Sequence, residues 1–140
     1  MSELETFDAL IGQTFDAVHA KVQGDAVRFI RDDEVLFKLH HEQDCCEAVW
    51  LEDIVGDLGD LIGTPITRAE KVTNRTPGIG VFIDAPLPEG EEDPDSYTWT
   101  YIWIGTTKGT VAFRWYGTSN GYYSEDVDLW DSTADDEEED

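Results

Sequence analysis

Aromatic residues alternate with smaller ones over residues 97–104, and this alternation restricts the fold more than any other feature of the chain. Tyrosines and tryptophans occupy the odd positions, whereas threonines and isoleucines occupy the even positions. After a Thr107-Lys108-Gly109 turn, Val111, Phe113 and Trp115 continue the pattern. Residues two apart lie on the same face of a strand, so the pattern predicts a two-sided β-hairpin.

Residues 14–41 predict a three-stranded antiparallel meander. Apolar residues alternate within residues 14–22 and again within residues 26–31, and a Gln-Gly-Asp turn separates the two segments. The Asp32-Asp33 pair marks a second turn, after which residues 35–41 alternate once more. Short alternating segments joined by turn residues are typical of consecutive antiparallel strands.

The middle of the chain predicts one short helix. Residues 43–51 suit a buried strand or a strand-to-helix junction. Gly56 and Gly59 each cost a helix about 1 kcal/mol relative to alanine, so we expect the helix to be limited to residues 53–62 and held by packing. The apolar residues at helical spacing are Ile54, Leu58, Leu61 and Ile62.

The remaining segments complete a mainly β architecture. Residues 64–73 predict a strand, and residues 74–96 predict a long loop because four of the five prolines lie there. An apolar stretch at 79–83 predicts a short strand within this loop, and a last strand ends near Trp130. We therefore predict a mainly β (α+β) fold, namely an antiparallel sheet, sandwich or open barrel of seven to eight strands with one short helix.

Composition indicates one folded domain. Hydrophobic residues make up 40% of the 140-residue chain, and rings are spread throughout it, whereas disordered acidic proteins have few aromatic residues. We expect a single globular domain over residues 1–130. Residues 131–140 hold seven of the acidic side chains, and we expect them to form a disordered tail.

The charge of the chain indicates where it functions. There are 32 acidic residues against 9 basic ones, a net charge of −23, and 25 acids against 9 bases remain without the last ten residues. Such a chain repels itself in dilute buffer, and molar salt weakens this repulsion by shortening the Debye length to about 3 Å. A protein of a halophile or of its virus fits this charge, and an acidic phage protein of an ordinary host is the alternative.

The cysteines and the first residues bear on localisation. Cys45 and Cys46 are neighbours, which disfavours an ordinary disulfide, so we expect reduced thiols in a cytoplasm. The first ten residues are acidic, unlike a signal peptide, and no apolar run approaches about 20 residues. We therefore expect no signal peptide and no membrane segment.

A cluster of metal-binding residue types lies at 40–47. Zinc is bound by imidazole, thiolate and carboxylate groups, but structural sites usually combine two ligand pairs, and His19 is the only other histidine. A complete site would need His19, a further carboxylate or a second subunit. The alternative is a strand end whose polar groups fix a turn while the thiols pack inside. The candidate metal ligands are His41, Asp44, Cys45, Cys46 and Glu47.

Catalysis has weak support in the sequence. A cysteine nucleophile with a histidine base would need a third group to orient the base, and none is recognisable. A zinc hydrolase would need an open coordination position with Glu47 as the general base. We therefore assign no catalytic residue.

The C-terminal hairpin and the loop after it offer a candidate ligand site. Flat rings suit stacking on a sugar or a nucleobase, and an arginine suits a phosphate or carboxylate. Core packing of the same rings is the alternative. Duplex nucleic acid is excluded as a partner because the chain has no basic surface. The candidate ligand-binding residues are Trp99, Trp103, Arg114, Trp115, Tyr116, Asn120, Tyr122 and Tyr123.

Three segments of the chain, residues 43–47, 56–63 and 114–124, together carry a family resemblance. They resemble a family of small uncharacterised proteins of tailed phages and prophages, domain of unknown function 7448, over most of residues 11–130. The chain departs from that pattern in its acidity, its longer loop around residues 86–95 and its acidic tail, which fits a virus or provirus of a haloarchaeon. The resemblance implies a phage accessory gene expressed inside the host, and it transfers no activity.

These observations support three hypotheses of function. The first is a non-enzymatic viral or proviral accessory protein that binds a small molecule or a host or viral protein through the aromatic and Asp-Cys-Cys-Glu regions. The second is a zinc module or a metal-dependent hydrolase, for which zinc would be the cofactor. The third is a structural component of the virion. We expect the protein in the host cytoplasm, or in the virion under the third hypothesis.

Overall fold

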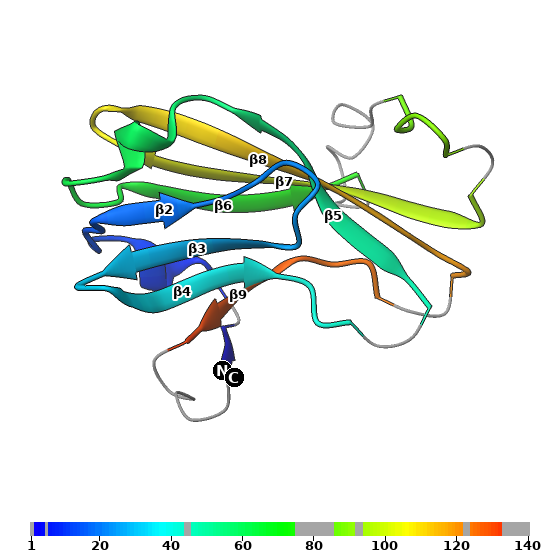
Figure 1. The fold of residues 1–140 in the computed structure, drawn as a ribbon, viewed down its shortest axis with the longest axis horizontal. Helices are drawn as coiled ribbons and strands as arrows, with labels where there is room; N and C mark the ends of the chain where they lie inside the picture. The colour runs from blue at the N-terminus through cyan, green and yellow to red at the C-terminus, as the bar shows by residue number, and fades with distance from the viewer. Residues whose placement is uncertain are drawn as a thin grey trace.

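Two antiparallel sheets packed face to face form the structure, which is a computed structural model (Figure 1). The structure describes residues 2–4, 6–43, 46–74, 86–91, 94–121 and 124–132. Both sheets are open, so the predicted mainly β antiparallel class is confirmed as two layers and not as a barrel. The described residues form nine strands, one more than the largest number predicted.

The five-stranded sheet contains the predicted meander. Val18, Phe29 and Phe37 lie in register across its three strands, and a bulge follows Phe29. Two strands from opposite ends of the chain extend this sheet. In order across the sheet, the strands are β1 (Ser2–Leu4), β9 (Asp128–Asp131), β4 (Glu34–His40), β3 (Ala26–Arg31) and β2 (Ala17–His19).

The four-stranded sheet is built around the predicted aromatic hairpin. Its two central strands pair from Ser96↔Ser119 to Thr106↔Gly109, which leaves a two-residue turn. In order across the sheet, the strands are β5 (Ala48–Val55), β8 (Gly109–Ser119), β7 (Ser96–Thr106) and β6 (Arg68–Thr73).

The hydrophobic core lies between the two sheets. Ile102, Ile104 and Phe113 of the four-stranded sheet are fully buried and belong to one cluster with Phe29 and Leu39 of the five-stranded sheet. Phe15 packs in the same cluster, with its ring centroid 5.3 Å from that of Phe29. Burial of apolar surface between the two layers is the main force that holds them together.

The predicted helix over residues 53–62 is wrong. β5 extends to Val55, and only a short 3-10 helix, η2 (Leu58–Leu61), follows it. Gly56 has φ +125°, and a Cβ there would lie 2.9 Å from the carbonyl oxygen of Thr110, so the chain turns sharply where a helix would have continued. A second 3-10 helix, η1 (Asp8–Leu10), precedes β2, and the described residues contain no α-helix.

Two predictions lie outside the described residues: the short strand at 79–83 and residues 133–140 of the acidic tail. Within the described part of the chain, no helix has the length and apolar character needed to span a bilayer.

Candidate binding site

The outer face of the four-stranded sheet carries six of the ten tyrosines and tryptophans in the sequence. In β7 the residues that point into the core are Thr98, Thr100, Ile102 and Ile104, so the tyrosines and tryptophans between them point outward. The register of β5 and β8 adds further residues to the same side. We call this surface the aromatic face; it carries Trp50, Tyr97, Trp99, Tyr101, Trp103, Arg114 and Tyr116.

Tyr116 is the centre of the ring cluster at one end of the aromatic face. Its ring centroid lies 5.1 Å from Trp50, 5.0 Å from Trp99 and 6.3 Å from Tyr97. Tyr116 is fully buried, and its hydroxyl donates a hydrogen bond to Oε1 of Glu91 at 3.3 Å. Burial, and then the nearby Glu91 carboxylate, raise the pKa of Tyr116 to about 12.

Arg114 lies between a ring and a carboxylate on this face. Its guanidinium carbon is 5.0 Å from the ring centroid of Trp99, and Nη2 is 3.7 Å from Oδ2 of Asp53. Nε of Arg114 is buried and has no hydrogen-bond partner among the described residues. The ring and the carboxylate therefore fix the guanidinium while one of its donors is unused.

Arg68 repeats this arrangement at the other end of the face. Its guanidinium carbon lies 5.5 Å from the ring centroid of Trp103, and Nη2 is 3.1 Å from Oε1 of Glu70. Tyr101 connects the two arrangements, with its ring centroid 5.7 Å from that of Trp103. Flat rings and guanidinium planes thus follow one another across the sheet, which suits stacking on a planar or cationic group.

The predicted ligand residues divide between this face and other places. Trp99, Trp103, Arg114 and Tyr116 lie on the aromatic face, where Trp99 and Tyr116 are buried and Trp103 and Arg114 are partly exposed. Asn120 lies beyond the end of β8 and is exposed, and Tyr122 and Tyr123 lie outside the described residues.

Trp115 does not lie on the aromatic face. It is 1% exposed in the core, where it pairs with Thr100. The prediction placed three residues in the turn, whereas Thr106 pairs with Gly109 and leaves two. A change of one residue in a turn exchanges the two faces of the following strand, so Trp115 faces the interior.

Several residues of this face are not among the predicted ligand residues. Tyr97 and Tyr101 belong to the alternation of residues 97–104, but the candidate ligand residues do not include them. Trp50 and Asp53 reach the face through the pairing of β5 with β8, at Trp50↔Tyr116 and Asp53↔Arg114, which no local pattern reveals. Glu91 comes from the predicted loop.

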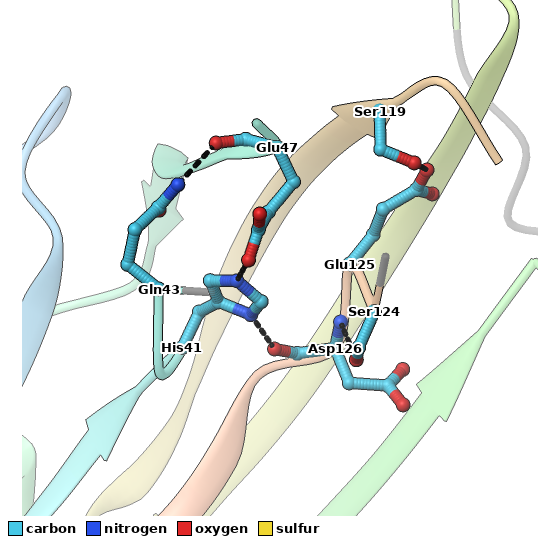
Figure 2. A network of polar contacts seen from close by, with 7 residues as sticks. All are labelled: His41, Gln43, Glu47, Ser119, Ser124, Glu125 and Asp126. Carbon is cyan, nitrogen blue, oxygen red and sulfur yellow. Dashed lines mark hydrogen bonds and ion pairs between the residues drawn. The ribbon is translucent and has the colours of Figure 1, made fainter. Parts of the chain in front are cut away.

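A second group of polar residues lies at the ends of β4 and β8 and is shown in Figure 2. His41 is buried, with Nδ1 2.7 Å from the backbone oxygen of Asp126 and Nε2 2.7 Å from Oε2 of Glu47. Gln43 donates from Nε2 to the backbone oxygen of Glu47 at 2.6 Å. These contacts connect the segment before β5 to the segment before β9.

The partners of His41 determine where its protons lie. A backbone carbonyl only accepts, so Nδ1 carries a hydrogen and donates it to Asp126. The contact between Nε2 and Glu47 then holds one further proton, on the ring or on the carboxyl group. Neither ring nitrogen has a lone pair available for a metal in this arrangement.

Glu125 is the second buried carboxylate of this region. It is 7% exposed and accepts hydrogen bonds from Oγ1 of Thr98 at 2.7 Å and from Oγ of Ser119 at 2.5 Å. The backbone and Cβ of Glu125 pack closely on Gly117. A Cβ atom added to Gly117 would lie 2.9 Å both from Cβ and from the backbone oxygen of Glu125. Two hydroxyl donors offset part of the cost of burying this carboxylate.

The predicted metal ligands are only partly described. His41 and Glu47 bond each other, and Asp44 and Cys45 lie outside the described residues. Cys46 is disulfide-bonded, which contradicts the expected reduced thiol. Within the described ranges, no three histidine, cysteine or carboxylate residues are placed to hold a metal ion.

A cavity of about 500 Å³ lies beside His41. Its lining is polar, and its carboxylates come from Glu3, Glu42, Asp126 and Asp128. The charge of Asp128, followed by burial, raises the pKa of Glu3 above its ordinary value. The four carboxylates of this cavity disfavour the binding of an anion.

Comparison with known proteins agrees with the resemblance noted in the sequence. The family model described as "Domain of unknown function (DUF7448)" matches residues 8–129, which span the strands from β2 to β8 and the first half of β9. Searches of curated proteins and of solved structures found no match.

Proposed function

Because the chain belongs to the DUF7448 family, a family of domains of unknown function, we propose a function from the geometry of its surface. The protein is a non-enzymatic binding protein, and the aromatic face is its binding surface. The ligand is a small molecule with a flat face, such as a sugar or a nucleobase, or the surface of a protein partner.

The main support for this proposal is that tyrosines and tryptophans of the β7–β8 hairpin point away from the core. Isoleucines and threonines fill the interior side of β7, whereas Tyr101 and Trp103 remain partly exposed on the outer side, beside Arg68 and Arg114. Tyrosine, tryptophan and arginine are the residue types most enriched at binding hot spots. The buried core cluster contains neither Tyr101 nor Trp103, so their partial exposure favours a role in recognition over a role in stability.

A thermal-shift screen in molar salt tests the proposal with nucleotides, sugars and basic peptides. A ligand at a hundred times its Kd stabilises the folded state by about 2.7 kcal/mol, which raises the melting temperature by roughly 10 °C for a domain of this size. Trp103→Ala should abolish most of this shift, and Trp103→Phe, which keeps a ring, should retain it. The proposal fails if no class of compound shifts the wild type, or if Trp103→Ala responds equally.

We also infer a setting for this binding protein: an accessory protein of a haloarchaeal virus or provirus, acting in the host cytoplasm. The acidity of the chain and the resemblance to phage and prophage proteins support this setting. The alternative within the same setting is a component of the virion. Mass spectrometry of purified particles distinguishes the two, because an accessory protein is absent from them.

The zinc module and metal-dependent hydrolase remain predictions. His41 offers no free ring nitrogen in the observed arrangement, so the described geometry favours the binding protein. Elemental analysis of the purified protein decides the matter. A folded preparation without metal would exclude both metal hypotheses.

A further inference from the structure

Trp50 and Glu52 form, we propose, a binding site for an arginine side chain of a basic protein partner. This inference rests on the proposed function, because Trp50 belongs to the aromatic face. It adds the chemical class of the partner and the position at which the partner is held.

The aromatic face already binds two arginines of its own chain in one manner. Arg114 stacks on Trp99 and pairs with a carboxylate from the neighbouring edge strand. Arg68 stacks on Trp103 and pairs with a carboxylate two residues further along the same strand. Each unit therefore consists of a tryptophan, a guanidinium and a carboxylate, which is the combination that recognises arginine.

Trp50 and Glu52 provide the ring and the carboxylate of a third such unit. They lie two residues apart on β5, and Nε1 of Trp50 donates to Oε1 of Glu52 at 2.7 Å, which fixes the two groups side by side. Gln23 also donates to Oε1 of Glu52, at 3.3 Å. Among the residues that the structure describes, no cation stacks on Trp50 or pairs with Glu52.

The position of β5 explains why the third guanidinium would come from another molecule. β5 is the edge strand of its sheet, so no strand of the described part of the chain lies beyond it to place an arginine beside Trp50. Backbone hydrogen bonds join Gln23 and Gly24, in the turn that Lys21 begins, to Leu51 on that side. Lys21 is exposed and, among the described residues, pairs neither with Glu52 nor with the ring of Trp50. Trp50 and Glu52 are both partly exposed, so an incoming side chain can reach them.

Charge complementarity favours a basic partner. With 32 acidic residues against 9 basic ones, the protein attracts a basic surface at long range and repels an acidic one. Arginine suits the site better than lysine because its planar guanidinium stacks on a ring while its edge bonds a carboxylate. Tyr116 is fully buried and hydrogen-bonded to Glu91, and it packs against Trp50 with 5.1 Å between the ring centroids. This contact helps to hold the Trp50 ring in place.

A synthetic peptide of alternating glycine and arginine is the probe, and peptides with lysine or uncharged citrulline in place of arginine are its controls. We expect the arginine peptide to bind with the highest affinity in titration calorimetry at moderate salt. Trp50→Ala and Glu52→Gln should each weaken this binding by about threefold to thirtyfold. Trp50→Phe, which keeps a ring, should weaken it less than Trp50→Ala.

Glu34→Gln is the matched control, because it removes the same charge from an exposed position on the other sheet and should leave the affinity unchanged within about twofold. Circular dichroism and melting temperature confirm that each variant is folded. The inference is overturned if Glu34→Gln weakens binding as much as Glu52→Gln, if the lysine peptide binds equally well, or if the arginine peptide does not bind. If another ligand still binds the aromatic face in any of these cases, only this inference fails; if no ligand does, the proposed function fails with it.

Discussion

The contact between His41 and Glu47 yields a prediction that separates a structural role from a metal site. Glu47→Ala would leave the ring of His41 buried without its partner at Nε2. With the shared proton on the ring the contact is a buried ion pair, and loss of one partner of such a pair costs about 3–5 kcal/mol, a large share of the roughly 5–15 kcal/mol that stabilises a typical domain. Glu47→Gln keeps a hydrogen bond, because its amide can donate to Nε2 while Nδ1 still donates to Asp126, so we expect a loss of only about 1 kcal/mol.

Urea unfolding followed by tryptophan fluorescence, at fixed salt and with and without a chelator, measures these differences. With a slope near 2 kcal/mol per molar urea, Glu47→Ala should lower the midpoint by about 2 M and Glu47→Gln by about 0.5 M. The chelator should change none of the midpoints. A metal site would instead make Glu47→Gln as damaging as Glu47→Ala, and the chelator would destabilise the wild type alone; that result would contradict a purely structural role for the contact.

Three further predictions concern the core, the buried tyrosine and the charge. Trp115→Ala should cost about 3–5 kcal/mol in urea unfolding, whereas Trp103→Ala on the outer face should cost about 1 kcal/mol; equal losses would contradict the opposite orientations of the two rings. The pKa of Tyr116 is raised to about 12, so the neutral phenol stabilises the fold fully below pH 10, and this contribution is lost as the pH rises from 10 to 12, by at most about 2.7 kcal/mol. The free energy of unfolding of Tyr116→Phe should therefore fall less over this range than that of the wild type. The net charge of −23 predicts that the urea midpoint rises between low and molar potassium chloride, and a midpoint independent of salt would contradict the role assigned to screening.

Local patterns predicted the parts of the fold that are made by neighbouring segments. The meander of β2, β3 and β4 and the β7–β8 hairpin follow from alternation and turn residues, because their strands are adjacent in the sequence. The pairing of β9 with β4 joins residues 128–131 to residues 37–40, and no local pattern encodes it. The helix was predicted from spacing alone, although Ile54 lies on a strand and Leu58 and Leu61 lie in a single 3-10 turn.

The candidate site shows the same division. The alternation in β7 placed Trp99 and Trp103 on one face correctly relative to each other. The side of Trp115 depended on the number of residues in one turn, and the place of Trp50 depended on a strand pairing across more than 60 residues. Both are properties of strand register, which sequence patterns specify weakly where both faces of a strand carry large residues.

Nuclear magnetic resonance of the indole groups can show whether the aromatic face binds a ligand, because the five tryptophans report on different places. Trp50, Trp99 and Trp103 lie on the aromatic face, Trp115 lies in the core, and Trp130 lies on the other sheet. The protein is titrated with the compound that raises its melting temperature most. We expect the indole signals of Trp50 and Trp103 to shift while those of Trp115 and Trp130 stay in place. Shifts confined to Trp115 or Trp130 would mean that the aromatic face is not the binding surface.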